Sequence, residues 1–233
     1  MSQAYQPYTP PRAEVRAAVD SRARFIVRTY NHLFGAIVLF TLLEIALFKS
    51  GMADVIAPAL GSSWLLVLGG FMIVSWLASR VAHSAGSLIA QYLALGLFVA
   101  AQAIVFVPLL FIADRFAPGA IQSAGLVTML GFAGLTAVAF VSRKDFSFLG
   151  AVLKWGGLCA LVLIGAALIF GFELGTFFSV AMVAFAGAAI LYDTSNVLHH
   201  FPEDRYVGAA LELFASVALL FWYVLRIFIA SRD

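Results

Sequence analysis

The chain has 233 residues, of which 63% are hydrophobic and only 11% charged, and its mean hydropathy is +1.01. Soluble domains carry about 25% charged and 45–50% apolar residues, so this composition excludes a soluble globular protein and indicates a polytopic membrane protein. The net charge is only +2 and the basic residues are scattered along the chain, so nucleic acid is not favoured as a partner. A single cysteine, Cys159, excludes a disulfide framework.

Residues 1–24 are polar and contain Pro7, Pro10 and Pro11 followed by several arginines. We expect them to form a polar, partly disordered N-terminal arm. The connections between the later apolar runs are too short to hold a core of their own. Residues 25–233 are therefore predicted to form a single transmembrane domain.

Seven apolar runs follow the arm, and each is about long enough to cross the hydrocarbon as a helix. Helices are expected because lipid offers no hydrogen-bond partner to an open backbone. The expected spans are 25–48, 62–82, 87–113, 119–141, 147–170, 174–197 and 207–230. The predicted fold is thus all-α, a bundle of seven transmembrane helices. A re-entrant last segment would leave six full spans.

The Lys and Arg residues predict the orientation of the chain. With seven spans, nine of them fall on the side of the N-terminus: Arg12, Arg16, Arg22, Arg24, Arg28, Arg80, Arg143, Lys144 and Arg205. Four fall on the other side: Lys49, Arg115, Arg226 and Arg232. The positive-inside rule then predicts a cytoplasmic N-terminus, and the short connections fit a bacterial inner membrane.

Small residues recur along the spans, for example Ala184, Gly187 and Ala188 in the sixth. Such residues let helix backbones approach closely. Packing within one bundle explains them, and a seam between two copies is the alternative. We therefore expect a monomer or a weak homodimer.

A carboxylate near the end of the sixth apolar run, Asp193, is the strongest candidate for a functional residue. A charge at the centre of a span costs roughly 2.5–3.5 kcal/mol on insertion scales. Asp193 lies about four residues from the predicted cytoplasmic end, or roughly 6 Å deep. Glu212 lies about five residues into the last span from the same side, and Ser216 follows one turn later. These three residues are expected to share a depth in the membrane.

Two basic residues are candidates to join them. Arg80 closes the second span on the same side, and Lys154 lies early in the fifth. Each also has a purely structural interpretation, because a long basic side chain can reach the lipid phosphates. Asp193 could likewise cap a neighbouring helix, and Glu44, at the opposite end of the first span, could reach the outer headgroups.

Burial, a neighbouring acid and a neighbouring Arg all act on the protonation of a carboxyl group. The cluster of Asp193, Glu212 and Arg80 is therefore expected to change its charge near neutral pH. Asp193 and Glu212 together can attract a divalent cation transiently, since Ca²⁺ prefers oxygen ligands. An ion pair with Arg80 would close the same path as a latch. His199 and His200 are expected in the connection nearby.

Two segments resemble motifs of the Bax inhibitor (lifeguard) family. Residues 142–150 read Ser-Arg-Lys-Asp-Phe-Ser-Phe-Leu-Gly, and residues 190–194 read Ile-Leu-Tyr-Asp-Thr. Arg28-Thr29-Tyr30 and the pair Trp76 and Arg80 also fit, so the resemblance covers about residues 22–230. It implies seven helices, one enclosed by the others. It also implies either a pH-sensitive calcium leak or modulation of a membrane-bound AAA protease, with suppression of cell death in other members.

The resemblance also implies an ion site. In the family, the Asp that matches Asp193 pairs with a second Asp in the last span and is latched by an Arg from the second span. Tyr192 and Thr194 flank Asp193 and are expected to support it. This chain departs from the pattern, because Ser216 stands where the second Asp belongs. We expect Glu212, one turn away, to take its place.

The sequence leads us to expect a calcium or other cation leak channel that is not an enzyme and needs no cofactor. An aspartyl intramembrane protease would need Gly-x-Gly-Asp, and a zinc protease would need His-Glu-x-x-His; neither occurs. The alternative is a regulator that transports nothing and binds a membrane-bound AAA protease or another membrane complex. Its polar residues would then be structural.

Overall fold

The computed structural model describes residues 12–84 and 87–232. In these residues every regular element is an α-helix. The helices are α1 (Arg12–Lys49), α2 (Met52–Ser62), α3 (Trp64–Ser84), α4 (Leu88–Phe116), α5 (Ala120–Ser142), α6 (Leu149–Phe170), α7 (Gly175–His199) and α8 (Tyr206–Ala230).

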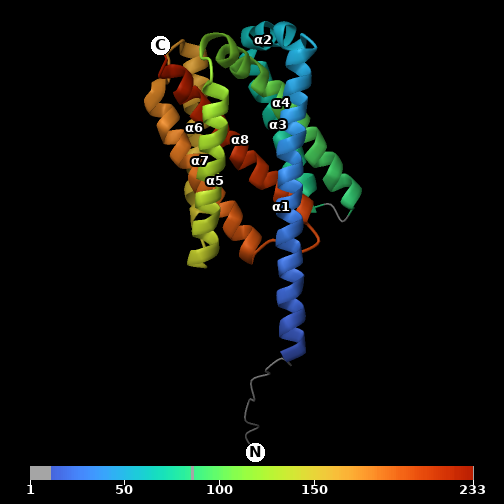
Figure 1. Ribbon diagram of the computed structural model, residues 1–233. Helices are drawn as coiled ribbons and strands as arrows, with labels where there is room; N and C mark the ends of the chain where they lie inside the picture. The colour runs from blue at the N-terminus through green and yellow to red at the C-terminus, as the bar shows by residue number, and fades with distance from the viewer. Residues whose placement is uncertain (1–11, 85–86, 233) are drawn as a thin grey trace, which may run out of the picture.

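Seven of these helices, all except α2, are long and apolar enough to cross a membrane. They match the seven predicted spans, so the all-α membrane bundle is confirmed. The helix α8 has 25 residues, which is enough for a full crossing and does not require a re-entrant segment. Accordingly, α1 begins and α8 ends at opposite ends of the bundle (Figure 1). We call the end that holds residues 200–205, between α7 and α8, the proximal end, and the end that holds α2 the distal end.

The predicted N-terminal arm is corrected over part of its length. The helix α1 begins at Arg12 and continues into the first span without a break. Residues 12–24 contain no Gly or Pro and include four alanines, which favour a helix. The Arg22 side chain also ties this segment to the end of α7, by donating hydrogen bonds to the carbonyl oxygens of Leu198 and Phe201. The expected disorder of residues 1–11 concerns residues outside the described range.

The short helix α2 was not predicted. It follows Gly51, whose positive φ of 74° lets the chain turn sharply after α1. Its buried residues Ala53 and Ala57 pack around Val107 of α4. With only 11 residues and Pro58 within it, α2 is too short to be recognised as a span.

The last helix, α8, is the enclosed one. It packs against α1, α3, α4, α5 and α7, and it carries more buried residues than any other helix. In Figure 1 it crosses behind α1 and α5 through the middle of the bundle. Ser216 and Tyr223 on α8 are therefore buried, and Glu212 is half-buried. By contrast, α6 packs mainly on α7 and exposes apolar residues.

Candidate functional site

The Asp193 carboxylate on α7 faces the Ser216 hydroxyl on α8. Ser216 Oγ donates a hydrogen bond of 2.5 Å to Asp193 Oδ2. Both residues are only 8% exposed. Because α7 and α8 run in opposite directions and pack along most of their length, residues at equal depth meet. The two residues were expected to share a depth in the membrane, and in the structure they are in direct contact.

The Glu212 carboxylate lies one helical turn before Ser216 on α8 and faces the same cavity as Asp193. Ser79 Oγ on α3 donates a hydrogen bond of 3.2 Å to Glu212 Oε1. Three helices thus contribute oxygen atoms to one polar cluster, which we define as Ser79, Asp193, Glu212 and Ser216. Oxygen atoms of this kind are the ligands that Ca²⁺ and Mg²⁺ prefer.

This polar cluster lies at one end of a long, partly open cavity of about 1080 Å³. The cavity is lined by α3, α4, α6, α7 and α8. On α7 its lining extends from Gly175 to Asp193, which corresponds to roughly 27 Å at 1.5 Å per residue. Its walls are mostly apolar, and its distal part includes Glu173 and Arg226. The cavity therefore connects the acidic residues with the distal end of the bundle.

Beyond the polar cluster, the proximal end is closed by packed side chains. Val197 and Phe201 follow Asp193 along the chain, and Val207 precedes Glu212; these three are 1%, 8% and 0% exposed. They belong to one hydrophobic core cluster that also contains Ala82 of α3. A solute that reached Asp193 from the distal end would need these side chains to move before it could pass.

The other predicted site residues lie as follows. Arg80 is exposed, and its guanidinium lies 5.0 Å above the ring of Trp76; its role as a latch stays a prediction. Lys154 has an exposed side chain on α6 and is not among the residues that line the cavity. Thr194 is completely buried.

The Tyr192 ring joins the two family motifs. A Cβ atom on Gly150, at the end of the first motif, would lie 2.9 Å from Tyr192 Cε2. Glycine at position 150 therefore makes room for the Tyr192 ring. The two motifs are in direct contact, which brings the connection between α5 and α6 against α7.

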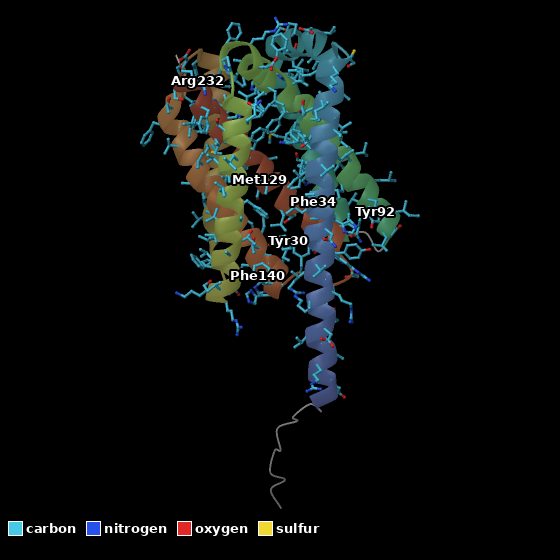
Figure 2. The ribbon with its side chains drawn as sticks, in the orientation of Figure 1. Tyr30, Phe34, Tyr92, Met129, Phe140 and Arg232 are labelled. Carbon is cyan, nitrogen blue, oxygen red and sulfur yellow. The ribbon has the colours of Figure 1, made fainter. Side chains whose placement is uncertain are left out.

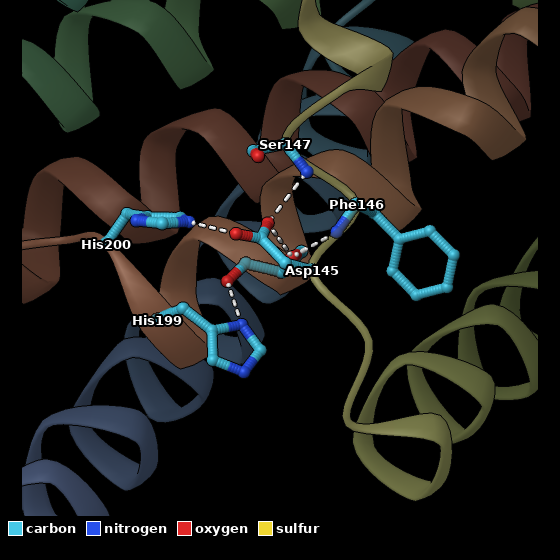
Figure 3. A network of polar contacts seen from close by, with 6 residues as sticks. Asp145, Phe146, Ser147, His199 and His200 are labelled. Carbon is cyan, nitrogen blue, oxygen red and sulfur yellow. Dashed lines mark hydrogen bonds and ion pairs between the residues drawn. The ribbon is translucent and has the colours of Figure 1, made fainter.

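A second polar network lies at the proximal end, at the connection between α5 and α6 (Figure 3). Asp145 Oδ1 accepts hydrogen bonds from the Ser147 N–H (2.8 Å) and from Ser195 Oγ (3.3 Å). Its Oδ2 atom lies 2.9 Å from His200 Nε2. The Phe146 N–H donates to Ser195 Oγ at 2.8 Å. The connection is thus attached to α7 two residues beyond Asp193.

These contacts favour the ionised form of the Asp145 carboxyl. The hydrogen bond from the Ser147 N–H, followed by the contact with His200, lowers the pKa of Asp145 to about 2. The sequence pointed to Asp145 only through the resemblance, and the roles of Ser195 and Ser79 were missed. Serine is common at helix ends and in spans, so its type alone gave no signal.

The position of Glu44 differs from the one expected from the sequence. It was expected to reach the headgroups, but it is only 7% exposed. Both of its oxygen atoms are buried, and neither has a hydrogen-bond partner among the described residues. Phe40, one turn earlier on α1, packs edge-on against Phe106, so Glu44 emerges on a face of α1 that is turned into the bundle.

Comparison with known proteins connects this arrangement to a family. The family model described as inhibitor of apoptosis-promoting Bax1 matches residues 22–233. Protein LIFEGUARD 4 of Arabidopsis thaliana is 33% identical over 151 residues, which cover 61% of this chain and 58% of that protein. The modulator of FtsH protease YccA of Escherichia coli is 34% identical over 110 residues, covering 46% of this chain and 49% of that protein.

A membrane protein of Vibrio cholerae matches over a longer region. It is 30% identical over 200 residues, covering 81% of this chain and 85% of that protein. The matches to the Arabidopsis and E. coli proteins span only about half of those relatives. The family model, however, covers nearly all of the described residues. The chain is therefore a member of the Bax inhibitor (lifeguard) family of multi-pass membrane proteins.

Proposed function

We propose that this protein is a pH-sensitive leak path for cations, Ca²⁺ foremost, with Asp193 at the ion and proton site. The observation that carries the proposal is the position of Asp193 and Glu212 at the closed end of a cavity about 1080 Å³ in volume. An acid buried inside a membrane bundle is costly, and such residues commonly mark ion or proton pathways.

In this proposal, Ca²⁺ is the permeant substrate and not a resident cofactor. Among the described residues, no group of three or more His, Cys, Asp or Glu side chains is arranged to hold a metal ion. Asp193 and Glu212 would supply the charge that attracts the cation, while Ser216 and Ser79 would supply neutral oxygens. Protonation of the carboxylates would remove that charge, which makes the path sensitive to pH.

The test is calcium efflux from proteoliposomes, measured with a calcium dye between pH 5 and pH 8. Asp193→Asn is expected to abolish most of the efflux and its pH dependence, and Glu212→Gln to weaken both. Asp54→Asn is the matched control, because Asp54 is an exposed acid paired with Arg115 on the surface. Efflux that is unchanged in Asp193→Asn would rule out Asp193 as the ion site, and wild-type efflux no faster than that of protein-free liposomes would rule out the leak.

A second candidate function is regulation of a membrane-bound AAA protease. The observation that favours it is the similarity to the E. coli protein described as a modulator of FtsH protease. Under this candidate, the protein binds the protease through its spans and transports nothing. Co-purification from native membranes, together with the degradation rate of a membrane substrate with and without the protein, distinguishes it from the leak.

We further propose a bacterial inner-membrane location with a cytoplasmic N-terminus, which makes the proximal end the cytoplasmic one. The relative from E. coli O6:H1 that is described as an inner membrane protein supports the location. Reporter fusions at residue 232 and in residues 143–148 test the orientation. We expect opposite sides for the two fusions, with residues 143–148 in the cytoplasm.

A further inference from the structure

A groove of about 290 Å³ lies between α1 and α4, and it shares no lining residue with the cavity of Asp193. Exposed apolar side chains occur in its lining and next to it in the sequence: Leu39 lines the groove and is 42% exposed, and Phe34, Leu93 and Leu97, each next in sequence to a lining residue, are 70%, 62% and 66% exposed. Figure 2 shows Phe34 on α1 and Tyr92 near the proximal end of α4. A surface of this kind in a membrane bundle faces the lipid.

The floor of the groove is apolar and narrow. Ala36 and Leu95 are 3% and 8% exposed and form part of the packed core. Gly35 and Gly96 lie beside them, and a Cβ atom on either glycine would meet nothing within 4 Å. The two glycines therefore leave open space next to an apolar floor, which suits a hydrocarbon chain.

The proximal end of the groove is polar. His32 Nδ1 lies 2.7 Å from the carbonyl oxygen of Arg28, and His32 Nε2 lies 2.8 Å from the Tyr92 hydroxyl. A carbonyl oxygen can only accept, so Nδ1 carries the hydrogen and a neutral His32 accepts from Tyr92 at Nε2. The His32 ring also lies 5.0 Å from the ring of Tyr206.

A positive charge stands beside this polar end. The Arg28 guanidinium lies 5.5 Å above the ring of Tyr206 and is exposed. Asn31 lines the groove one residue before His32 and is also exposed. Since His32 and Tyr92 satisfy each other, the Arg28 and Asn31 N–H groups are the donors best placed to meet an anion. Arginine suits a phosphate because its planar fork of N–H groups matches the phosphate oxygens.

We propose that the groove binds one phospholipid, with an acyl chain against Gly35, Leu95 and Gly96 and its phosphate at Arg28 and Asn31. The polar end of the groove matches the phosphate of a phospholipid, and the apolar floor matches its acyl chain. The polar end lies near the membrane boundary, about two turns from the start of the predicted first span, and the apolar floor extends inward from it. This site does not depend on the proposed leak function.

The test uses native mass spectrometry of the full chain in detergent, with dioleoylphosphatidylglycerol as the probe. One lipid is expected to remain bound to the wild type after mild activation. Gly35→Leu with Gly96→Leu fills the groove and should abolish retention. Gly69→Leu on α3 is the matched control, because Gly69, like the two groove glycines, has nothing within 4 Å of its Cβ position and lies outside the groove. Arg28→Gln should weaken retention by about tenfold, as loss of a charge-assisted hydrogen bond does.

Two further probes separate the parts of the ligand. Dioleoylglycerol lacks the phosphate, and retention equal to that of the phospholipid would overturn the role of Arg28. Inorganic phosphate lacks the acyl chains. If it raised the unfolding temperature as much as the phospholipid does, the site would be one for free phosphate and not for a lipid. Retention that is unchanged in the double leucine variant would overturn the groove itself. If that variant does not fold, the surface variant Arg28→Gln tests the proposal instead, and phospholipid retention equal to that of the wild type would contradict it.

Discussion

Gly208 of α8 lies directly against the backbone of Ala82 of α3. A Cβ atom on Gly208 would stand only 2.6 Å from the Ala82 carbonyl oxygen and 3.1 Å from its Cβ atom. Small residues allow this closeness between helices in membranes. Ser79 is one turn before Ala82 and Glu212 one turn after Gly208, so this contact sets the separation of the two side chains that meet in the polar cluster.

Gly208→Ala is therefore expected to push α3 away from α8. The clash is with backbone atoms, which cannot move aside as a side chain can, so we expect a loss of about 1–3 kcal/mol of stability, typical of overpacking. The proximal closure would also loosen, and cation leak in proteoliposomes should rise. Thermal unfolding in detergent and dye efflux measure the two effects.

Gly165→Ala on α6 is the control for this prediction. A Cβ atom there would meet nothing within 4 Å. Because Ala favours a helix more than Gly, this variant should be as stable as the wild type or slightly more stable. A Gly208→Ala protein that unfolds at the same temperature as Gly165→Ala would contradict the close contact.

Ser216→Asp is expected to strengthen the cation site. The Ser216 hydroxyl is 2.5 Å from Asp193 Oδ2, so an Asp at this position would place two carboxylates in direct contact. The polar cluster would then hold three carboxylates in place of two, which should bind a divalent cation more tightly. Ca²⁺ should therefore raise the unfolding temperature of Ser216→Asp more than that of the wild type. Ser216→Ala should reduce the effect of Ca²⁺, and equal calcium effects in all three proteins would speak against ion binding here.

The spans were predictable because the bilayer fixes their length, and every predicted span corresponds to a long helix. The errors lie where that constraint is absent. The helix α2 is too short to be required by the membrane, and residues 12–24 lie before the first apolar run. Their helical structure depends on alanine content and on the contact of Arg22 with the end of α7.

The depth of the polar-cluster residues in the membrane could be predicted, but the direction of their side chains could not. Counting residues from the span ends correctly brought Asp193, Ser216 and Glu212 to one level. It could not say which way a side chain points around the helix axis. For this reason the contact of Ser79 with Glu212 and the burial of Glu44 were missed, although both follow from the rotation of α3 and α1 in the bundle.

The Asp145 network predicts a pH-dependent stability at acid pH. The pKa of Asp145 falls from its ordinary value of 3.8 to about 2 in the folded protein. A group with a lowered pKa stabilises the fold above its unfolded pKa, and this stabilisation disappears as the pH falls through the folded value. The wild type should therefore be more stable than Asp145→Asn above about pH 4, and the difference should vanish towards pH 2.

Unfolding temperatures between pH 2 and pH 6 measure this difference. Ser142→Ala is the control, since Ser142 lies at the same connection but does not contact Asp145: its Oγ donates to the Ala139 carbonyl and accepts from the Lys144 N–H, both at 3.5 Å. Its profile should parallel the wild type. A gap between wild type and Asp145→Asn that stays constant down to pH 2 would show that the lowered pKa does not contribute.

Glu44→Leu is expected to stabilise the protein. The Glu44 carboxyl is 7% exposed, and among the described residues neither of its oxygens has a hydrogen-bond partner. Burying a polar group without a partner costs about 1–3 kcal/mol, and leucine of similar size removes that cost while keeping the packing around Phe40. Thr41→Leu, on an exposed position of the same helix, should change stability little. The unfolding temperature in detergent compares the two variants. A Glu44→Leu protein that unfolds earlier than the wild type, or that loses cation flux, would mean that this carboxyl has a partner or a role that its apolar surroundings conceal.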